Sequence, residues 1–129
     1  MSQYGRLLPH TNKQQYNGYE RIAEVKSNGW IWALMTITNQ SFTQLESHPN
    51  THESFEPNHG VTIMALSAQY TPQDFRLFLL DEAILLHPGI WHQVMCLSRN
   101  SSFKIIENNE VATMTYDLEF SVSNSLCIL

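Results

Sequence analysis

The feature that most constrains the fold of this chain is a series of short β-prone runs separated by clusters of turn-forming residues. No long window keeps the hydrophobic period of a helix. Short strands that recur about every ten residues, with Gly, Pro, Asn and Ser between them, are typical of β-sandwiches and barrels. The expected strands cover residues 30–38, 61–67, 75–80, 83–86, 93–97, 103–107 and 111–120.

Two of these runs indicate which faces should be buried. Residues 30–38 are apolar on both sides, which predicts a strand buried on both faces. Residues 111–120 alternate, which predicts one inward and one solvated face. The inward set is Ala112, Met114, Tyr116, Leu118 and Phe120, and the outward set is Thr113, Thr115, Asp117 and Glu119. Between these runs, Thr71 and Pro72 favour one helical turn over residues 71–74.

Composition bounds the class of protein. With 129 residues, 43% of them hydrophobic and 15% charged, the chain is expected to form a single globular domain over residues 1–129. The net charge is −5 and the seven basic residues are scattered, which argues against a nucleic-acid or membrane-surface binder. Residues 1–9 lack a signal-peptide pattern, so a cytoplasmic protein is expected. Cys96 and Cys127 are then expected to be free, buried thiols.

Two segments carry residues suited to chemistry. In residues 45–57, Glu46 and His48 are two apart and would share one face of a strand, and Glu53 follows a turn at Pro49-Asn50. In residues 86–92, a Pro-Gly turn precedes His92 at the start of the next strand. These segments are the candidate site.

The spacing Glu46-x-His48-x4-Glu53, followed later by Gly89-x-x-His92, resembles the two metal-binding motifs of cupins. That resemblance implies that Glu46, His48, Glu53 and His92 hold a divalent metal. Two carboxylates and two imidazoles would suit Ni, Mn, Fe or Zn, and the sequence does not choose among them.

A closer resemblance is to the ureidoglycolate lyase family, carried by LESHPNTHESFEP at 45–57, LLHPGIWHQV at 85–94 and SFKIIEN at 102–108. It implies an all-β fold, the cupin double-stranded β-helix or jelly-roll barrel. The implied activity is a lyase that releases urea and glyoxylate from a 2-hydroxy acid with metal assistance. The matching positions are Glu46, His48, Pro49, Phe55, Pro57, His87, Trp91, His92 and Phe103.

The resemblance also implies roles. Glu46, His48, His87 and His92 are the expected catalytic residues, with Glu46, Glu53 or His87 as the base that takes the substrate's hydroxyl proton. Two other functions remain open: a cupin enzyme acting on another small carboxylate or sugar acid, and a non-catalytic cupin that binds a small ligand. Family members are generally homodimers, so a dimer that also buries the apolar tail 125–129 is expected.

This chain departs from the family pattern at four places. Glu53 replaces Gln, Pro88 replaces Arg, Gln93 replaces the second His of a pair, and Glu107-Asn108 replaces Asp-Arg. Two arginines that could hold a carboxylate are therefore missing.

The remaining cations near the expected strands are Arg76, Arg99 and Lys104. Lys104 is expected to point outward, because its neighbours Phe103 and Ile105 are better core residues. The metal is then the expected anchor for a negatively charged substrate.

Other chemically suggestive residues have simpler explanations. His10, His52 and His59 are expected on the surface, and Trp91 is expected to pack in the barrel rather than touch substrate. Trp30 and Trp32 are expected in the core or in a dimer interface.

Overall fold

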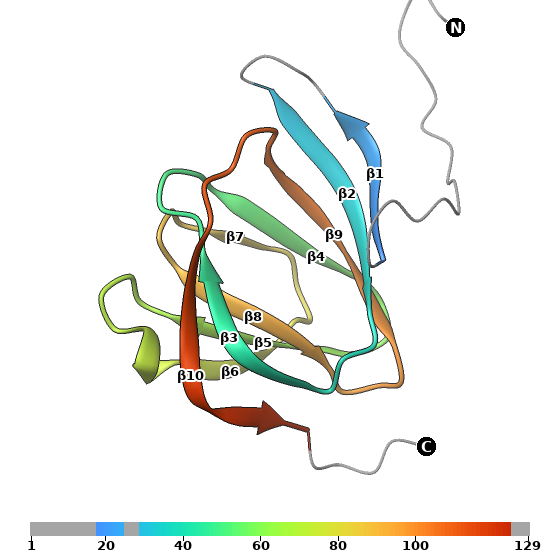
Figure 1. Ribbon diagram of the computed structural model, residues 1–129. Coiled ribbons are helices and arrows are strands. Elements are labelled where there is room, and N and C mark those ends of the chain that lie inside the picture. The colour runs from blue at the N-terminus through green and yellow to red at the C-terminus, as the bar shows by residue number, and fades with distance from the viewer. Residues whose placement is uncertain (1–17, 25–28, 125–129) are drawn as a thin grey trace, which may run out of the picture.

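In the computed structural model, which describes residues 18–24 and 29–124, two antiparallel five-stranded sheets face each other and form a barrel (Figure 1). The first sheet has the strand order β1-β2-β9-β4-β7, and the second has the order β10-β3-β8-β5-β6. The strands of the first sheet are β1 (Tyr19–Glu24), β2 (Trp30–Ile37), β9 (Ser101–Asn108), β4 (Glu53–His59) and β7 (Ile84–Leu86). Those of the second are β10 (Met114–Ser123), β3 (Ser41–Ser47), β8 (Trp91–Cys96), β5 (Thr62–Ser67) and β6 (Arg76–Leu79).

The seven strands expected from the sequence are all present, with bounds that shift by a few residues. The helical turn is present as a 3-10 helix, η1, over Pro72–Asp74. Three strands, β1, β3 and β4, lie outside the runs that the sequence predicted as strands.

The prediction that β2 is buried on both faces is wrong. Ile31, Ala33 and Ile37 are buried, but Trp30 is 43% exposed and Trp32 is half-buried. The two faces differ because the sheet that contains β2 has only one side turned toward the barrel interior. Apolar residues on the other side face outward.

The predicted alternation of the last strand holds only in part. Tyr116 and Leu118 pack against buried residues, as expected. Met114 is 52% exposed and Phe120 58% exposed. Val122 packs on the same cluster as Tyr116 and Leu118, so the period of two is kept, but that cluster lies outside the barrel. Thr113, expected on the solvated face, instead lines the barrel cavity.

The buried residues form two clusters on opposite sides of the second sheet. Successive side chains of a strand point to opposite faces of the sheet. Met64 and Val94 therefore join one cluster, whereas their chain neighbours Ala65 and Met95 join the other. The first cluster draws residues from both sheets and fills the barrel interior. The second, Phe42, Leu45, Ala65, Trp91 and Met95, comes only from β3, β5 and β8 and lies on the outer face of their sheet.

Candidate functional site

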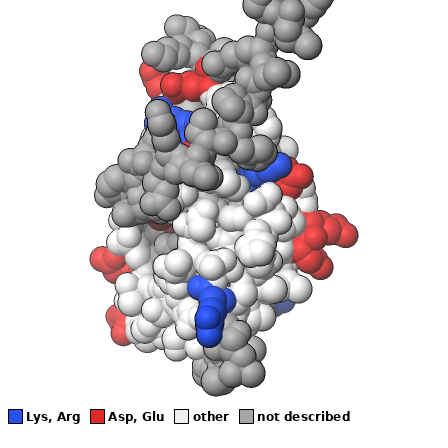
Figure 2. Space-filling model, turned by 90° about the vertical axis from the view of Figure 1, so that its right-hand side faces the viewer, with Lys and Arg blue, Asp and Glu red and all other residues white. Residues whose placement is uncertain are grey.

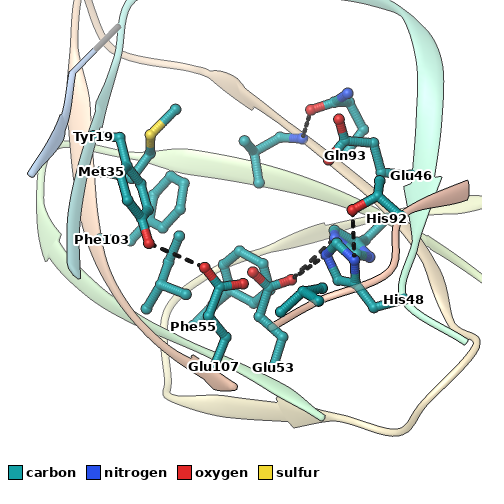
Figure 3. Close-up of a pocket in the computed structure, with 14 residues that line it drawn as sticks. Tyr19, Met35, Glu46, His48, Glu53, Phe55, His92, Gln93, Phe103 and Glu107 are labelled. Carbon is teal, nitrogen blue, oxygen red and sulfur yellow. Dashed lines mark hydrogen bonds and ion pairs between the residues drawn. The ribbon is translucent and has the colours of Figure 1, made fainter. Parts of the chain in front are cut away.

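A cavity of about 320 Å³ lies inside the barrel, with polar side chains on one part of its wall and apolar side chains on the rest (Figure 3). This volume is in the range of small-molecule pockets. The polar lining residues are Tyr19, Glu46, His48, Glu53, His92, Gln93, Glu107 and Thr113. The apolar lining residues are Met35, Phe55, Val94, Phe103, Ile105 and Val111.

The fold brings the two sequence motifs together. Glu46 on β3 is the register partner of His92 on β8, so the two side chains are direct neighbours across the strands. Gly89, which has φ of 85° in the turn before β8, donates its N–H to the His48 carbonyl at 2.9 Å. Glu53 begins β4 in the opposite sheet and completes the group.

Glu53 lies between the two imidazoles. Its Oε1 atom is 3.2 Å from His48 Nε2 and 3.1 Å from His92 Nε2, and all three side chains are buried. Despite these distances, Oε1 receives no well-directed hydrogen bond. A buried carboxylate oxygen without a donor is costly unless something else compensates its charge.

The other nitrogen of each ring explains this arrangement. His48 Nδ1 lies 3.2 Å from the Ala112 carbonyl, and His92 Nδ1 lies 3.1 Å from the Ile90 carbonyl. Because a carbonyl only accepts, Nδ1 carries a proton in each ring. A protonated ring then also donates from Nε2 to Glu53, whereas a neutral ring presents a lone pair there. With both rings neutral, two nitrogen lone pairs and one carboxylate oxygen converge on one buried point.

This convergence fits a divalent metal ion. Backbone carbonyls that fix the Nδ1–H tautomer are the usual support of metal-binding histidines. Two sets of side chains each bring one donor atom per residue within 4.8 Å of one another: Glu46, His48 and His92, and His48, Glu53 and Glu107. Nitrogen and carboxylate donors suit Mn, Fe, Ni or Zn, as the sequence motifs implied.

Electrostatics keep Glu53 ionised. Burial alone would raise the pKa of the Glu53 carboxyl, but His48 and His92 outweigh that effect and lower the pKa to about 2. Glu53 in turn raises the pKa of His48. A proton and a metal ion would therefore compete for His48 Nε2.

A second polar pair lies beside this group. The Tyr19 hydroxyl donates a hydrogen bond of 3.0 Å to Glu107 Oε1, and Glu107 is the register partner of Glu53. Burial and the neighbouring Glu53 carboxylate raise the pKa of Glu107 to about 7. Burial and Glu107 likewise raise the pKa of Tyr19, which keeps its hydroxyl a donor.

Sequence reasoning missed Tyr19 and Glu107 as site residues. The signal for Glu107 was present, because residues two apart in a strand share a face and Phe103, Ile105 and Glu107 follow that spacing. Glu107 lies two residues beyond Ile105, on the face opposite to that of Lys104. Tyr19 lies in a polar segment with no strand signal.

His87 and Gln93 make no direct contact with Glu53. The His87 side chain is exposed and is not part of this cavity wall, but it lines a smaller pocket on which His48, Glu53 and His92 also lie; its ring is 6.3 Å from that of His52. Gln93 lines the cavity and uses its amide on the backbone: it donates to the Gln44 carbonyl at 2.9 Å and accepts from the Val94 N–H at 3.0 Å. The contact with Gln44 joins β8 to β3, which share one register pair.

Several expectations about surrounding residues are confirmed. His52 and His59 are exposed, and Cys96 is buried and free. Trp91 does not line the cavity, as expected, but it packs in the outer cluster and not in the barrel interior, and it donates to the Gln69 carbonyl at 2.9 Å. His10 and Cys127 lie outside the described residues.

Cations lie away from the cavity. Lys104 points outward as predicted, with its ammonium 5.7 Å from the centre of the Trp32 ring. Arg76 and Arg99 are exposed. Within residues 18–24 and 29–124, no Lys or Arg lines the cavity. On the face seen in Figure 2, Lys and Arg side chains lie apart from one another rather than forming a patch.

The barrel, with histidines and carboxylates in its interior, defines the chain as a cupin. Solved structures with this fold are distant in sequence. Peruvianin-I, a cysteine peptidase from Thevetia peruviana latex, is 10% identical with a TM-score of 0.60, and the match covers 83% of this chain and 72% of that one. A cupin 2 domain-containing protein from Halorhodospira halophila is 14% identical with a TM-score of 0.55, covering 78% and 71%. These likenesses show the fold alone.

CapF, solved with the inhibitor 3-isopropenyl-tropolone, is 15% identical with a TM-score of 0.60. That match covers 84% of this chain but only 34% of CapF. The search of curated proteins finds no match.

The family model for ureidoglycolate lyase matches residues 9–127. The chain therefore belongs to the ureidoglycolate lyase family, and its family supports a lyase-type enzyme with a small-molecule substrate. In the part of the chain that the structure describes, no helix is long and apolar enough to span a membrane.

Proposed function

We propose that this protein is a metal-assisted ureidoglycolate lyase, which releases urea and glyoxylate from a 2-hydroxy acid. The observation that carries the proposal is the buried Glu53 Oε1 atom, 3.1–3.2 Å from two imidazole Nε2 atoms and without a directed hydrogen bond. The family match gives the class of reaction.

His48, His92 and Glu53 would hold the metal. We assign Glu46, expected from the sequence as both ligand and catalytic residue, to catalysis. Glu46 is half-buried on the cavity wall, and one of its carboxylate oxygens lies within 4.8 Å of a nitrogen of each imidazole, which places it beside a substrate bound at the metal. A bound divalent ion would polarise the hydroxyl and carboxylate of the substrate and make the hydroxyl more acidic.

The reaction needs one proton to leave an oxygen and one to reach a nitrogen. The Glu46 carboxylate takes the proton of the substrate hydroxyl. The electron pair of the O–H bond forms the carbonyl of glyoxylate, the C–N bond breaks, and the Glu46 carboxyl returns its proton to the leaving nitrogen to give urea. The step needs no oxidant or reductant.

Among the residues that the structure describes, none on the cavity wall is a Lys or Arg that could hold the substrate carboxylate. We therefore expect the wild-type protein to release urea and glyoxylate together, and we expect chelation of the metal to stop release. Glycolate, a 2-hydroxy acid without the ureido group, should bind in calorimetry before chelation and not after it. Colorimetric urea and glyoxylate assays on samples of measured metal content test whether product release depends on the metal.

Two results would contradict the proposal. Equal affinity for glycolate before and after chelation would show that the protein, not a metal, anchors the carboxylate. Metal-dependent glycolate binding without urea release would assign the cavity to a different small carboxylate or sugar acid, or to ligand binding without catalysis.

We also propose that the protein forms a homodimer through the outer face of the second sheet. Leu77 and Leu79 on β6 pair in register with Ala65 and Ile63, so they point to the same side as the outer cluster. They are 47% and 51% exposed. Within residues 18–24 and 29–124, β6 has a hydrogen-bonded neighbour on one side, β5.

The occupant that fits this face is a second copy of the chain. Phe120 extends the face from β10, with its ring 6.4 Å from that of Phe75. Large exposed apolar surfaces with unpaired edges are usually covered in soluble proteins. An apolar face is complementary to itself, as a two-fold symmetric contact requires.

Light scattering at micromolar concentration should therefore report a dimer. Leu79→Glu places a charge in the contact and should give a folded monomer, because residue 79 is half exposed within one chain. Leu85→Glu is the control, since Leu85 is exposed on β7 of the other sheet. A monomeric wild type, or a Leu79→Glu variant that stays dimeric, would contradict this interface.

A further inference from the structure

The cavity has two chemically different ends. Figure 3 shows His48 and His92 at one side, and Tyr19, Met35 and Phe103 at the other. Three carboxylates line it, from Glu46, Glu53 and Glu107, and no described Lys or Arg does. In the proposed function the metal and the base account for Glu53 and Glu46. Glu107 has no role there.

Glu107 has the geometry of a hydrogen-bond acceptor held in place. The Tyr19 hydroxyl donates to its Oε1 atom at 3.0 Å and fixes the carboxyl group. One donor does not saturate a carboxylate, whose two oxygens offer about four acceptor positions. A ligand group that faces Glu107 must therefore bring N–H or O–H donors, and a second carboxylate would be repelled there.

The wall beside Tyr19 is apolar. Met35 and Phe103 lie beside Tyr19 on the cavity wall, and Phe103 is fully buried. Apolar side chains provide no competing polar partner, so donors of a bound ligand would turn toward Glu107. A ureido group is planar, small, neutral and carries several N–H donors.

We propose that Glu107, positioned by Tyr19, binds the N–H groups of the substrate's ureido end while the metal end binds its carboxylate. This inference rests on the proposed function and adds the residue that selects a ureido acid over a simple 2-hydroxy acid. Glu107 is thus a specificity-determining residue, and Tyr19 is a positioning residue.

The test compares two ligands on the metal-loaded protein by calorimetry. N-carbamoylglycine carries a carboxylate and a ureido group but no hydroxyl, so it cannot react. Glycolate carries the carboxylate and hydroxyl but no ureido group. Glu107→Gln should weaken N-carbamoylglycine binding about 10-fold, because a buried donor left without its acceptor costs about 1–3 kcal/mol. Glycolate binding should stay unchanged.

Two further variants sharpen the result. Tyr19→Phe removes only the hydroxyl that holds Glu107, and should weaken N-carbamoylglycine by about 3-fold, a smaller effect typical of a neutral hydrogen bond. Glu110→Gln is the control for the loss of one negative charge, since Glu110 is exposed beyond the end of β9. It should leave both affinities unchanged.

The failures are distinguishable. If wild type binds glycolate with metal but not N-carbamoylglycine, or if Glu107→Gln weakens both ligands equally, the ureido-binding role of Glu107 is wrong and the proposed function stands. Loss of metal from Glu107→Gln would make Glu107 a ligand instead, which also overturns this inference. If the affinity for glycolate is the same with and without the metal, the proposed function itself is wrong.

Discussion

Glu53→Gln puts into this chain the residue that the family usually has at this position. It is expected to remove the metal here, and with it the activity, because Gln93 stands where the family has a second His, so no further imidazole replaces the lost ligand. The substitution keeps the size of the side chain but replaces the charged oxygen that lies between His48 and His92 with a neutral amide. Loss of an outer partner of a metal ligand already costs about 10–100-fold in affinity, so loss of a charged ligand should exceed about 100-fold. Metal content after dialysis and the rate of urea release should fall together.

The matched control is Glu56→Gln on the same strand, because Glu56 is exposed on the outer side of β4. It should keep the wild-type metal content. A second measurement does not depend on activity: chelation should lower the melting temperature of the wild type and leave that of Glu53→Gln unchanged, since a ligand stabilises only a fold that binds it. A Glu53→Gln variant with full metal content would contradict the assignment of Glu53 as a metal ligand.

The strands that could be predicted from the sequence are those with a plain apolar signal. β5 and β8 are rich in Ile, Met, Val and Leu, and their runs are bounded by turn residues. β4 was missed because Glu53, Glu56 and Pro57 look unlike a strand. Pro57 is tolerated there because the pairing of β4 with β7 covers only Glu53 to Phe55, and the register with β9 shifts just after Pro57.

The candidate site was partly predictable for a related reason. Glu46, His48, Glu53 and His92 stand in two local motifs, so spacing along the chain indicated them. Tyr19 and Glu107 reach the cavity only through pairing of β1 with β2, β2 with β9 and β9 with β4. Such long-range pairings are set by tertiary structure. The excess of acidic groups in the cavity was therefore visible only once the barrel was formed.

Glu46→Gln is expected to separate catalysis from metal binding. Glu46 neighbours His92 across the strands and faces the cavity, but it forms no ion pair with His48 or His92 in the described part of the chain. If it is the base, the amide cannot take the hydroxyl proton. Turnover should then fall about 100- to 10,000-fold, the usual contribution of a positioned acid or base. Glycolate affinity and metal content should stay close to those of the wild type.

Lower turnover with unchanged metal content distinguishes a catalytic base from a metal ligand. A ligand substitution lowers metal content and activity together, as expected for Glu53→Gln, whereas loss of a base leaves a loaded but inactive enzyme. Glu119→Gln, an exposed carboxyl on β10, controls for the change of charge. Loss of metal from Glu46→Gln would place Glu46 in the coordination sphere, as the motif resemblance first implied. The hydroxyl proton would then need another acceptor, and within the described cavity wall the remaining carboxylate is Glu107.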